Sequence, residues 1–286
     1  MSEVLVFAPL ARADSARSLL ARACRGTGIT ARLELFGSSG ALFQRMRARR
    51  SPPQPDVVLW HGPYAAHAAA LDNLLQPYEP STLPAAAAHD PGWRWVATEF
   101  HTWSVKGEPS VDGFQELSSV PRLALIDPER SEVGMFALVA ALDATRQTDG
   151  DVERGWAWWT RRDQAGLSLA LDSAEALGWV AQRKVSHALT LQSGASPLSG
   201  LAPVPHAIGL AAGARNPEPA RQMVDWLVSQ DALATDSVSA WQAATNGLHA
   251  LLQAGPPTDI EWATRQYRAV RQRWAQSGFG AAPTGG

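Results

Sequence analysis

The chain has 286 residues, a formal net charge of −2 and a single cysteine. A near-neutral charge supplies no basic surface for nucleic acid, and one cysteine excludes both an internal disulfide and a cysteine-rich metal site. No stretch approaches the ~18 apolar residues that span a bilayer, and the length suggests one large or two medium domains at ~100–200 residues each. The first residues show no leader pattern, so we expect either a cytosolic protein or a mature form whose leader has been removed.

The first 80 residues alternate between predicted strands and helices. Apolar runs and period-two alternation predict strands at 4–7, 29–35 and 57–60, and Asp14 is the expected N-cap of the first helix. Short strands that alternate with helices are typical of a parallel sheet covered by helices. We therefore expect an α/β fold.

The rest of the chain continues this pattern after an irregular segment. Residues 81–120 are rich in Pro, Ala and Gly near their start and indicate a crossing between lobes. Beyond them we expect the following elements: strands at 123–126, 188–191 and 207–211, and helices at 132–144, 151–162, 173–182, from 217 onward and over most of the last 50 residues.

A small-residue turn, Gly37-Ser38-Ser39-Gly40, lies between a predicted strand and helix. The first turn of a helix has N–H groups without helical acceptors and the positive end of the helix dipole, so Ser38, Ser39 and Gly40 could bind an anion. The alternative is an ordinary serine N-cap in a tight turn.

Asp127-Pro128 and Ser131 form a second strand-to-helix junction in the other half of the chain. Ser131, Glu132 and Val133 could again hold an anion, although a capped helix explains the same residues. Two such junctions in two halves would clamp a ligand from both sides.

Aromatic residues supply further candidates. Trp60 and His61 follow the third predicted strand, and ligands of open parallel sheets lie beyond the carboxyl ends of strands. Trp103 lies near the predicted crossing, where an aromatic face could stack on a ligand. The alternatives are core tryptophans and a solvated loop histidine.

Several segments, in order, resemble the type II periplasmic solute-binding proteins of ABC importers, especially the branch of ferric-ion, phosphonate and sugar-phosphate binders. The segments that carry the resemblance are GSSGALFQRM, PDVVLW, PRLALIDPERSEVGMFALVAAL and HAIGLAAGARNPEPARQMVDWLVSQDA. The resemblance implies a two-lobe fold with a hinge of crossing strands and a ligand between closing lobes. Ser38 and Ser39 match the anion loop of the first lobe, His61 falls near a ligand position, and Ser131 and Glu132 match the second-lobe junction.

The resemblance also implies a division of the chain. We expect residues 1–85 and 204–250 in the first lobe and residues 86–203 and 251–280 in the second lobe. Residues 281–286 are expected to form a disordered tail.

Two departures from the family bear on the ligand. The ferric binders resembled here use adjacent tyrosines where this chain has residues 189–192, and none of its three tyrosines lies there. The molybdate binders carry a serine after the first strand, where this chain has Pro9-Leu10-Ala11. Both departures argue against a ferric ion and a bare oxyanion, whereas the twelve tryptophans favour an organic ligand.

We therefore expect the substrate-binding component of an ABC importer, which binds a small anionic organic solute such as a phosphonate or phosphorylated compound. It is expected to be a periplasmic monomer that works with an inner-membrane permease and needs no cofactor, metal or nucleic acid. A cytosolic ligand sensor, or a cleft enzyme using His61 or Glu132 as acid or base, stays open. A ferric ion or an inorganic oxyanion is the alternative ligand.

Overall fold

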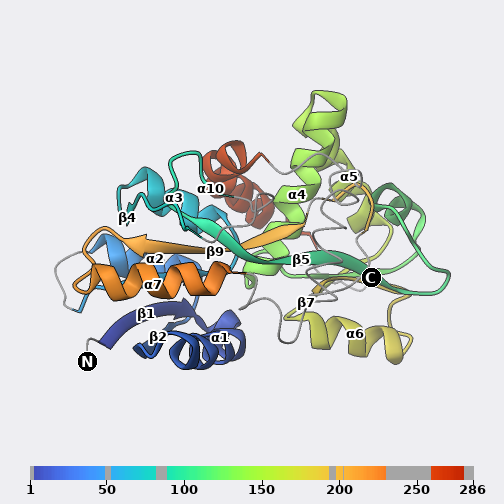
Figure 1. The fold of residues 1–286 in the computed structure, drawn as a ribbon. Helices are drawn as coiled ribbons and strands as arrows, with labels where there is room; N and C mark the ends of the chain where they lie inside the picture. The colour runs from blue at the N-terminus through green and yellow to red at the C-terminus, as the bar shows by residue number, and fades with distance from the viewer. Residues whose placement is uncertain are drawn as a thin grey trace. The chain divides into compact units, whose positions relative to one another are not determined.

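The computed structural model describes residues 3–48, 53–81, 89–192, 198–201, 203–229 and 259–279 (Figure 1). The chain forms two compact units, which are Met1–Phe100 with Val204–Asn246 (unit 1) and His101–Pro203 with Gly247–Gly286 (unit 2). Residues 89–100 fall in unit 1, whereas the sequence analysis assigned them to the second lobe. The predicted division of the chain into two functional lobes stays a prediction. The predicted tail, residues 281–286, lies outside the described residues.

The sheet of unit 1 mixes parallel and antiparallel strands. Its strands are β1 (Glu3–Pro9), β2 (Thr30–Phe36), β3 (Val57–Trp60), β4 (Leu75–Gln76), β9 (Val204–Ala211) and the first part of β5 (Val96–Gly107). β1 pairs in parallel with β2 and β3, as predicted. β9 runs antiparallel to both β3 and β4. The parallel sheet predicted from the first 80 residues is confirmed for β1, β2 and β3, whereas β9 joins it antiparallel because the chain returns to this unit late and enters the sheet from the opposite end.

Helices cover both faces of this sheet. They are α1 (Ala13–Thr27), α2 (Ser39–Arg47), α3 (Tyr64–Leu71) and α7 (Pro217–Val228), and a 3-10 turn, η1 (Leu10–Arg12), precedes α1. Apolar side chains of α1 and α7 pack together against β1, β3 and β9. The N-cap of α1 is Arg12, and its side chain makes no capping hydrogen bond. The prediction of Asp14 as N-cap is wrong, because the 3-10 turn leads directly into the helix.

In unit 2 the strand order is β5–β8–β6–β7. β6 (Leu123–Ile126) is parallel to β7 (Leu167–Ala170) and to β8 (His187–Gln192), whereas β5 is antiparallel to β8. β5 is twelve residues long and passes from unit 1 into unit 2, where the sequence indicated only an irregular crossing. The predicted strands at 123–126 and 188–191 are confirmed.

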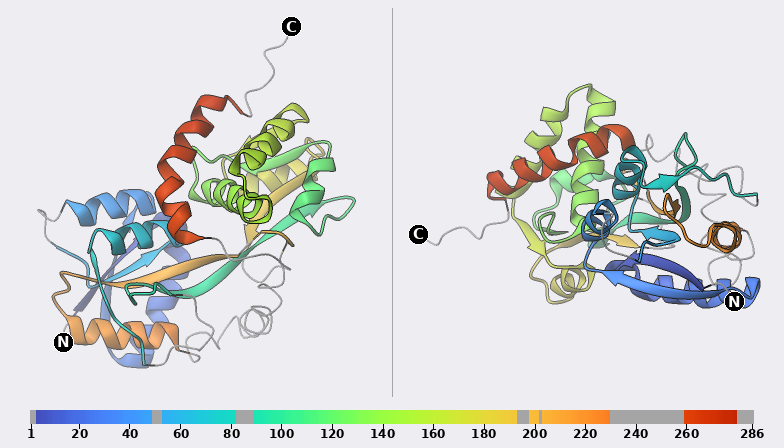
Figure 2. Two further views of the ribbon diagram at one scale, coloured as in Figure 1. Left: turned by 90° about the horizontal axis from the view of Figure 1, so that it is seen from above. Right: turned by 90° about the vertical axis from the view of Figure 1, so that its left-hand side faces the viewer.

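The helices of unit 2 are α4 (Glu132–Asp149), α5 (Val152–Gln164), α6 (Ser173–Ala181) and α10 (Ile260–Ser277), and η2 (Phe114–Ser119) is a 3-10 helix. Figure 2 shows α10 beside α4. Edge-to-face and tilted aromatic contacts, with centroids 4.6–5.6 Å apart, join a row of rings across this unit: Phe114, Trp158, Trp159, Trp274 and Phe279. The Trp-rich helix is thus a core element. Within the described residues, none of the helices combines the length and the apolar character needed to cross a membrane.

Candidate functional site

The junction of β2 and α2 forms the first candidate site, in unit 1. Ser38 has an extended backbone, and its Oγ accepts a hydrogen bond from the Ala41 N–H at 3.0 Å, so it is the N-cap of α2. Ser39 is buried, and its Oγ accepts a hydrogen bond from the His61 N–H at 3.3 Å. The two hydroxyls therefore differ in role: one caps the helix, and the other ties the helix start to the end of β3.

His61 and Trp60 at the end of β3 have different surroundings. His61 is 7% exposed, and its ring lies edge-on to the ring of His206 on β9, with centroids 4.8 Å apart. Trp60 is fully buried, and its carbonyl accepts a hydrogen bond from Arg12 Nη1 at 3.1 Å. The Trp60 ring therefore packs in the core of unit 1, and this burial weighs against stacking on a ligand.

A buried arginine at this sheet edge was missed by the sequence analysis. Arg12 ends the 3-10 turn after β1, is 1% exposed, and directs Nη2 toward Thr98 Oγ1 at 3.5 Å. The Thr98 hydroxyl in turn donates to the His206 carbonyl at 3.3 Å. A cation at the start of a helix is disfavoured by the helix dipole. This unusual placement is the sequence signal that could have identified Arg12.

We call the buried side chains near the carboxyl ends of the parallel strands β1, β2 and β3 the unit 1 polar cluster: Arg12, Ser39, His61, Thr98 and His206. They come from the segments after β1, β2 and β3 and from β5 and β9. Ligands of open α/β sheets bind beyond the carboxyl ends of the parallel strands. The cluster therefore lies at the edge of the unit 1 sheet where the sequence predicted a ligand.

The junction of β6 and α4 forms the second candidate site, in unit 2. Ser131 is the N-cap of α4, and its Oγ accepts a hydrogen bond from the Val133 N–H at 3.2 Å. The Ser131 N–H donates to the Asp127 carbonyl at 2.9 Å. A side chain at Gly134 would place its Cβ 2.2 Å from the carbonyl oxygen of Ile126. Glycine thus lets the first turn of α4 press against the end of β6.

Tyr267 of α10 lies close enough to Glu132, at the start of α4, for the charge of that carboxylate to affect the Tyr267 phenol. Burial first, and then the negative charge of Glu132, raise the pKa of Tyr267 above its usual value, whereas Arg271 lowers it. Tyr267 is therefore a neutral phenol at pH 7. Across the described residues, no group of three or more His, Cys, Asp or Glu could hold a metal ion.

Trp103, predicted to contact a ligand, packs inside unit 2. It lies on β5 opposite Leu191 of β8, and it is 1% exposed. The residues that replace the tyrosines of the ferric binders lie on β8, where the hydroxyl of Thr190 is 3.2 Å from that of Ser104. As with Trp60, burial weighs against a stacking role for Trp103.

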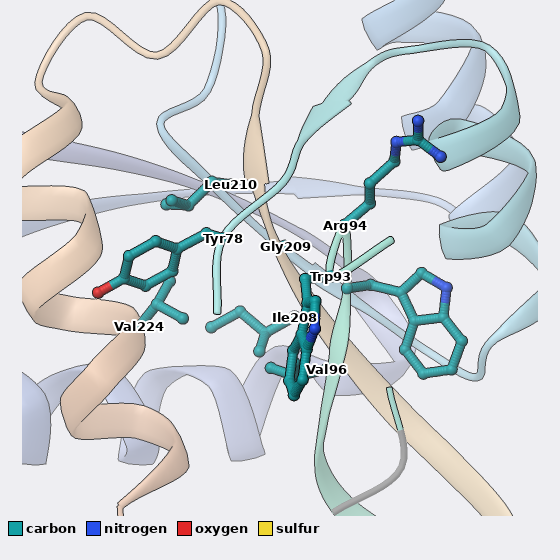
Figure 3. A pocket seen from close by; sticks show the side chains of 9 residues that line it. Tyr78, Trp93, Arg94, Val96, Ile208, Gly209, Leu210 and Val224 are labelled. Atoms are coloured by element: carbon teal, nitrogen blue, oxygen red, sulfur yellow. The ribbon is translucent and has the colours of Figure 1, made fainter. Parts of the chain in front are cut away.

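A pocket in unit 1 shares no residue with these junctions (Figure 3). It is formed by Tyr78, Trp93, Arg94, Trp95, Val96, Ile208, Gly209, Leu210 and Val224. Its lining comes from the middle of β9, the start of β5, α7 and the segment before β5. None of the predicted site residues lines it.

No protein-family model and no curated protein matches the chain. Solved structures do match. Iron-bound HitA from Pseudomonas aeruginosa has a TM-score of 0.75 at 14% identity, covering 96% of this chain and 99% of that one. The periplasmic binding protein AfuA from Actinobacillus pleuropneumoniae, with fructose-6-phosphate bound, has a TM-score of 0.73 at 15% identity, covering 99% and 100%.

The substrate-binding domain of a putative molybdenum ABC transporter from Clostridium difficile is a further match. It has a TM-score of 0.57 at 14% identity and covers 81% of this chain and 94% of that one. Identities this low establish the fold. The chain therefore has the two-lobe α/β fold of the type II periplasmic binding proteins, which the sequence resemblance predicted.

Proposed function

We propose that the protein is the substrate-binding component of an ABC importer and that it binds a small anionic organic solute, such as a phosphonate or phosphorylated compound. One observation carries the proposal. In each unit a parallel strand leads into a serine-capped helix, β2 into α2 and β6 into α4. The start of a helix attracts anions through its dipole and its N–H groups, so each unit offers one half of an anion clamp.

The roles of the candidate residues follow from their surroundings. The proposal assigns the anionic group to the turns Ser38–Gly40 and Ser131–Val133, and it assigns contact with the rest of the ligand to His61. Trp60 and Trp103 are buried, so they would shape the site from behind. AfuA is described with a bound sugar phosphate, which supports a ligand of this class in this fold.

The alternative ligand, a ferric ion, has less support. HitA is described with iron, so the fold accommodates that ligand as well. The resemblance places the iron-binding tyrosines of that branch at residues 189–192, and this chain has none there.

The binding role, the location and the partner of the protein are proposed from the similar solved structures. They are binding proteins, described as periplasmic or as part of an ABC transporter. We extend this to the present chain as a binding role without catalysis, a periplasmic location, a membrane permease as partner and a monomeric state.

Calorimetric titration with phosphonates, phosphate esters and neutral sugars tests the proposal. We expect phosphonates or phosphate esters to bind, and Ser39→Ala and Ser131→Ala each to weaken binding by about tenfold or more, because a hydrogen bond to a charged group contributes about 1.5–3 kcal/mol. Binding of a neutral sugar alone, unaffected by both substitutions, would overturn the anion clamp.

A matched control separates capping from binding. Asp151 caps α5 through an Oδ1 that accepts a hydrogen bond from the Glu153 N–H at 2.8 Å. Asp151→Ala and Ser131→Ala should both lower the free energy of unfolding by about 1 kcal/mol. We expect only Ser131→Ala to weaken the binding of the ligand.

A further inference from the structure

Arg12 occupies a position that the folding of its own helix does not explain. It is the N-cap of α1, a position where Ser, Thr, Asp and Asn are favoured and a cation is disfavoured. Its side chain makes no capping hydrogen bond. At 1% exposure the guanidinium has also lost its water, which is costly unless protein groups replace it. The reason for an arginine must therefore lie in what it contacts.

Its contacts connect the 3-10 turn after β1 with three strands at one edge of the unit 1 sheet. Nη1 donates to the Trp60 carbonyl at the end of β3, at 3.1 Å. Nη2 points to the Thr98 hydroxyl on β5 at 3.5 Å, and that hydroxyl donates to the His206 carbonyl on β9 at 3.3 Å. The planar guanidinium can serve two acceptors at fixed angles, which an ammonium cannot do in the same way.

These contacts converge on His61. Its peptide bond begins at the Trp60 carbonyl that Arg12 holds, and its N–H donates to Ser39 at 3.3 Å. Its ring lies edge-on to His206, with centroids 4.8 Å apart. Arg12 therefore restrains His61 in two ways. It holds the Trp60 carbonyl of the His61 peptide bond, and through Thr98 it is linked to His206, whose ring contacts the His61 ring.

We propose that Arg12 is a positioning residue that sets the orientation of His61, and through it the affinity of the unit 1 half of the anion site. The role in affinity rests on the proposed function, whereas the role in orienting His61 does not. Arg12 acts through the Trp60 carbonyl and through Thr98, so it need not touch the ligand.

Unit 2 contains a matched control. Arg162 is also 1% exposed, and its Nη1 donates to the Val120 carbonyl at 2.6 Å and to the Ser118 carbonyl at 3.4 Å. None of these partners is a candidate site residue. Arg12→Met and Arg162→Met thus remove equally buried guanidiniums. Only Arg12→Met should change the orientation of His61.

The experiment combines binding, thermal unfolding and histidine NMR on the full chain. Calorimetry with methylphosphonate and with inorganic phosphate gives the affinities. The imidazole signals of His61, assigned with His61→Gln, report its ring without any ligand. We expect both Met variants to lower Tm, but only Arg12→Met to move the His61 signals and to weaken binding at least tenfold. Arg12→Lys should recover part of both effects, because one acceptor can still be reached.

Each outcome decides a separate point. Unchanged His61 signals in Arg12→Met would overturn the positioning role, and so would equal loss of affinity in Arg162→Met. If Arg12→Met does not fold, Thr98→Val is the second variant: it removes the hydroxyl that accepts from Arg12 and donates to the His206 carbonyl, and it leaves the bond from Arg12 to the Trp60 carbonyl in place. Thr98→Val should still move the His61 signals, and their constancy would count against the proposal. If the unsubstituted protein binds neither probe while Arg12→Met still moves the signals, the anion clamp fails and the positioning role stands.

Discussion

The phenol of Tyr78 is held in its neutral form by its surroundings. Burial, followed by the hydrogen bond and negative charge of Asp225, raises its pKa to about 12, while Arg221 acts in the opposite direction. The folded state therefore binds the phenolic proton more tightly than the unfolded chain, whose tyrosines titrate near 10. The resulting stabilisation is complete below pH 10 and is lost as the pH rises from 10 to 12.

We predict that Asp225→Asn lowers the pKa of Tyr78 toward 10, because it removes the charge while keeping a similar shape. Phenolate absorbance during a pH titration measures this pKa, and Tyr78→Phe identifies the signal. Asp14→Asn, at a fully exposed carboxylate, serves as the control and should leave the titration unchanged. An unaltered curve in Asp225→Asn would show that Asp225 does not set this pKa.

Single residues also show what sequence reasoning can reach. A serine cap was the alternative to an anion site at both junctions, and Ser38 and Ser131 are the caps. This signal is local, because an N-cap bonds within three residues of itself. Arg12 was missed, because its partners lie 48 and 86 residues away in the chain. The burial of Trp60 and Trp103 depends on contacts equally remote, so their ligand roles could not be judged from the sequence.

The start of α4 depends on one glycine. A Cβ on Gly134 would lie 2.2 Å from the Ile126 oxygen and 2.6 Å from the Asp127 carbonyl carbon, and both are backbone atoms that cannot rotate away. We predict that Gly134→Ala lowers the free energy of unfolding by about 1–3 kcal/mol, the usual cost of overpacking. Because the helix start must shift, binding of any anion at Ser131 should weaken as well.

Gly178 in α6 provides the comparison for this prediction. The nearest atom to a Cβ placed there is the side-chain nitrogen of Gln182, at 3.8 Å. Gly178→Ala should raise the free energy of unfolding by up to about 1 kcal/mol, because alanine favours helix more than glycine does. Urea unfolding measures both variants, and equal effects at the two positions would contradict the role of close packing at α4.

The strands and helices themselves were more predictable than their arrangement. Apolar runs identified β3 and β6, because periodicity and burial are properties of short segments. The antiparallel direction of β9 depends on how the chain returns to unit 1. The length of β5 depends on its passage from one unit into the other. No local pattern encodes either feature, so neither the direction of β9 nor the length of β5 could be predicted from the sequence.

For the molecule as a whole, the twelve tryptophans favoured an organic ligand with a face to stack on, and core packing was the alternative weighed for most of them. Many of these rings instead build the cores of the two units, and they include Trp60, Trp95, Trp103, Trp156, Trp158, Trp159 and Trp274. The two-lobe fold itself followed from resemblance across most of the chain, and the solved structures confirm it at 12–15% identity.

The anion clamp makes a prediction that involves both units at once. A ligand held by both junctions should slow hydrogen exchange in α2 of unit 1 and in α4 of unit 2, because binding to the native state suppresses local opening wherever contacts form. Exchange measured by mass spectrometry with and without methylphosphonate tests this. Peptides from α5, which carries no candidate residue, should change less. Ser39→Ala and Ser131→Ala should each reduce protection in both helices at a fixed ligand concentration, because losing one half of the clamp releases the ligand from the other. Protection confined to a single unit, and lost only with the serine of that unit, would mean that the ligand is bound by one junction alone.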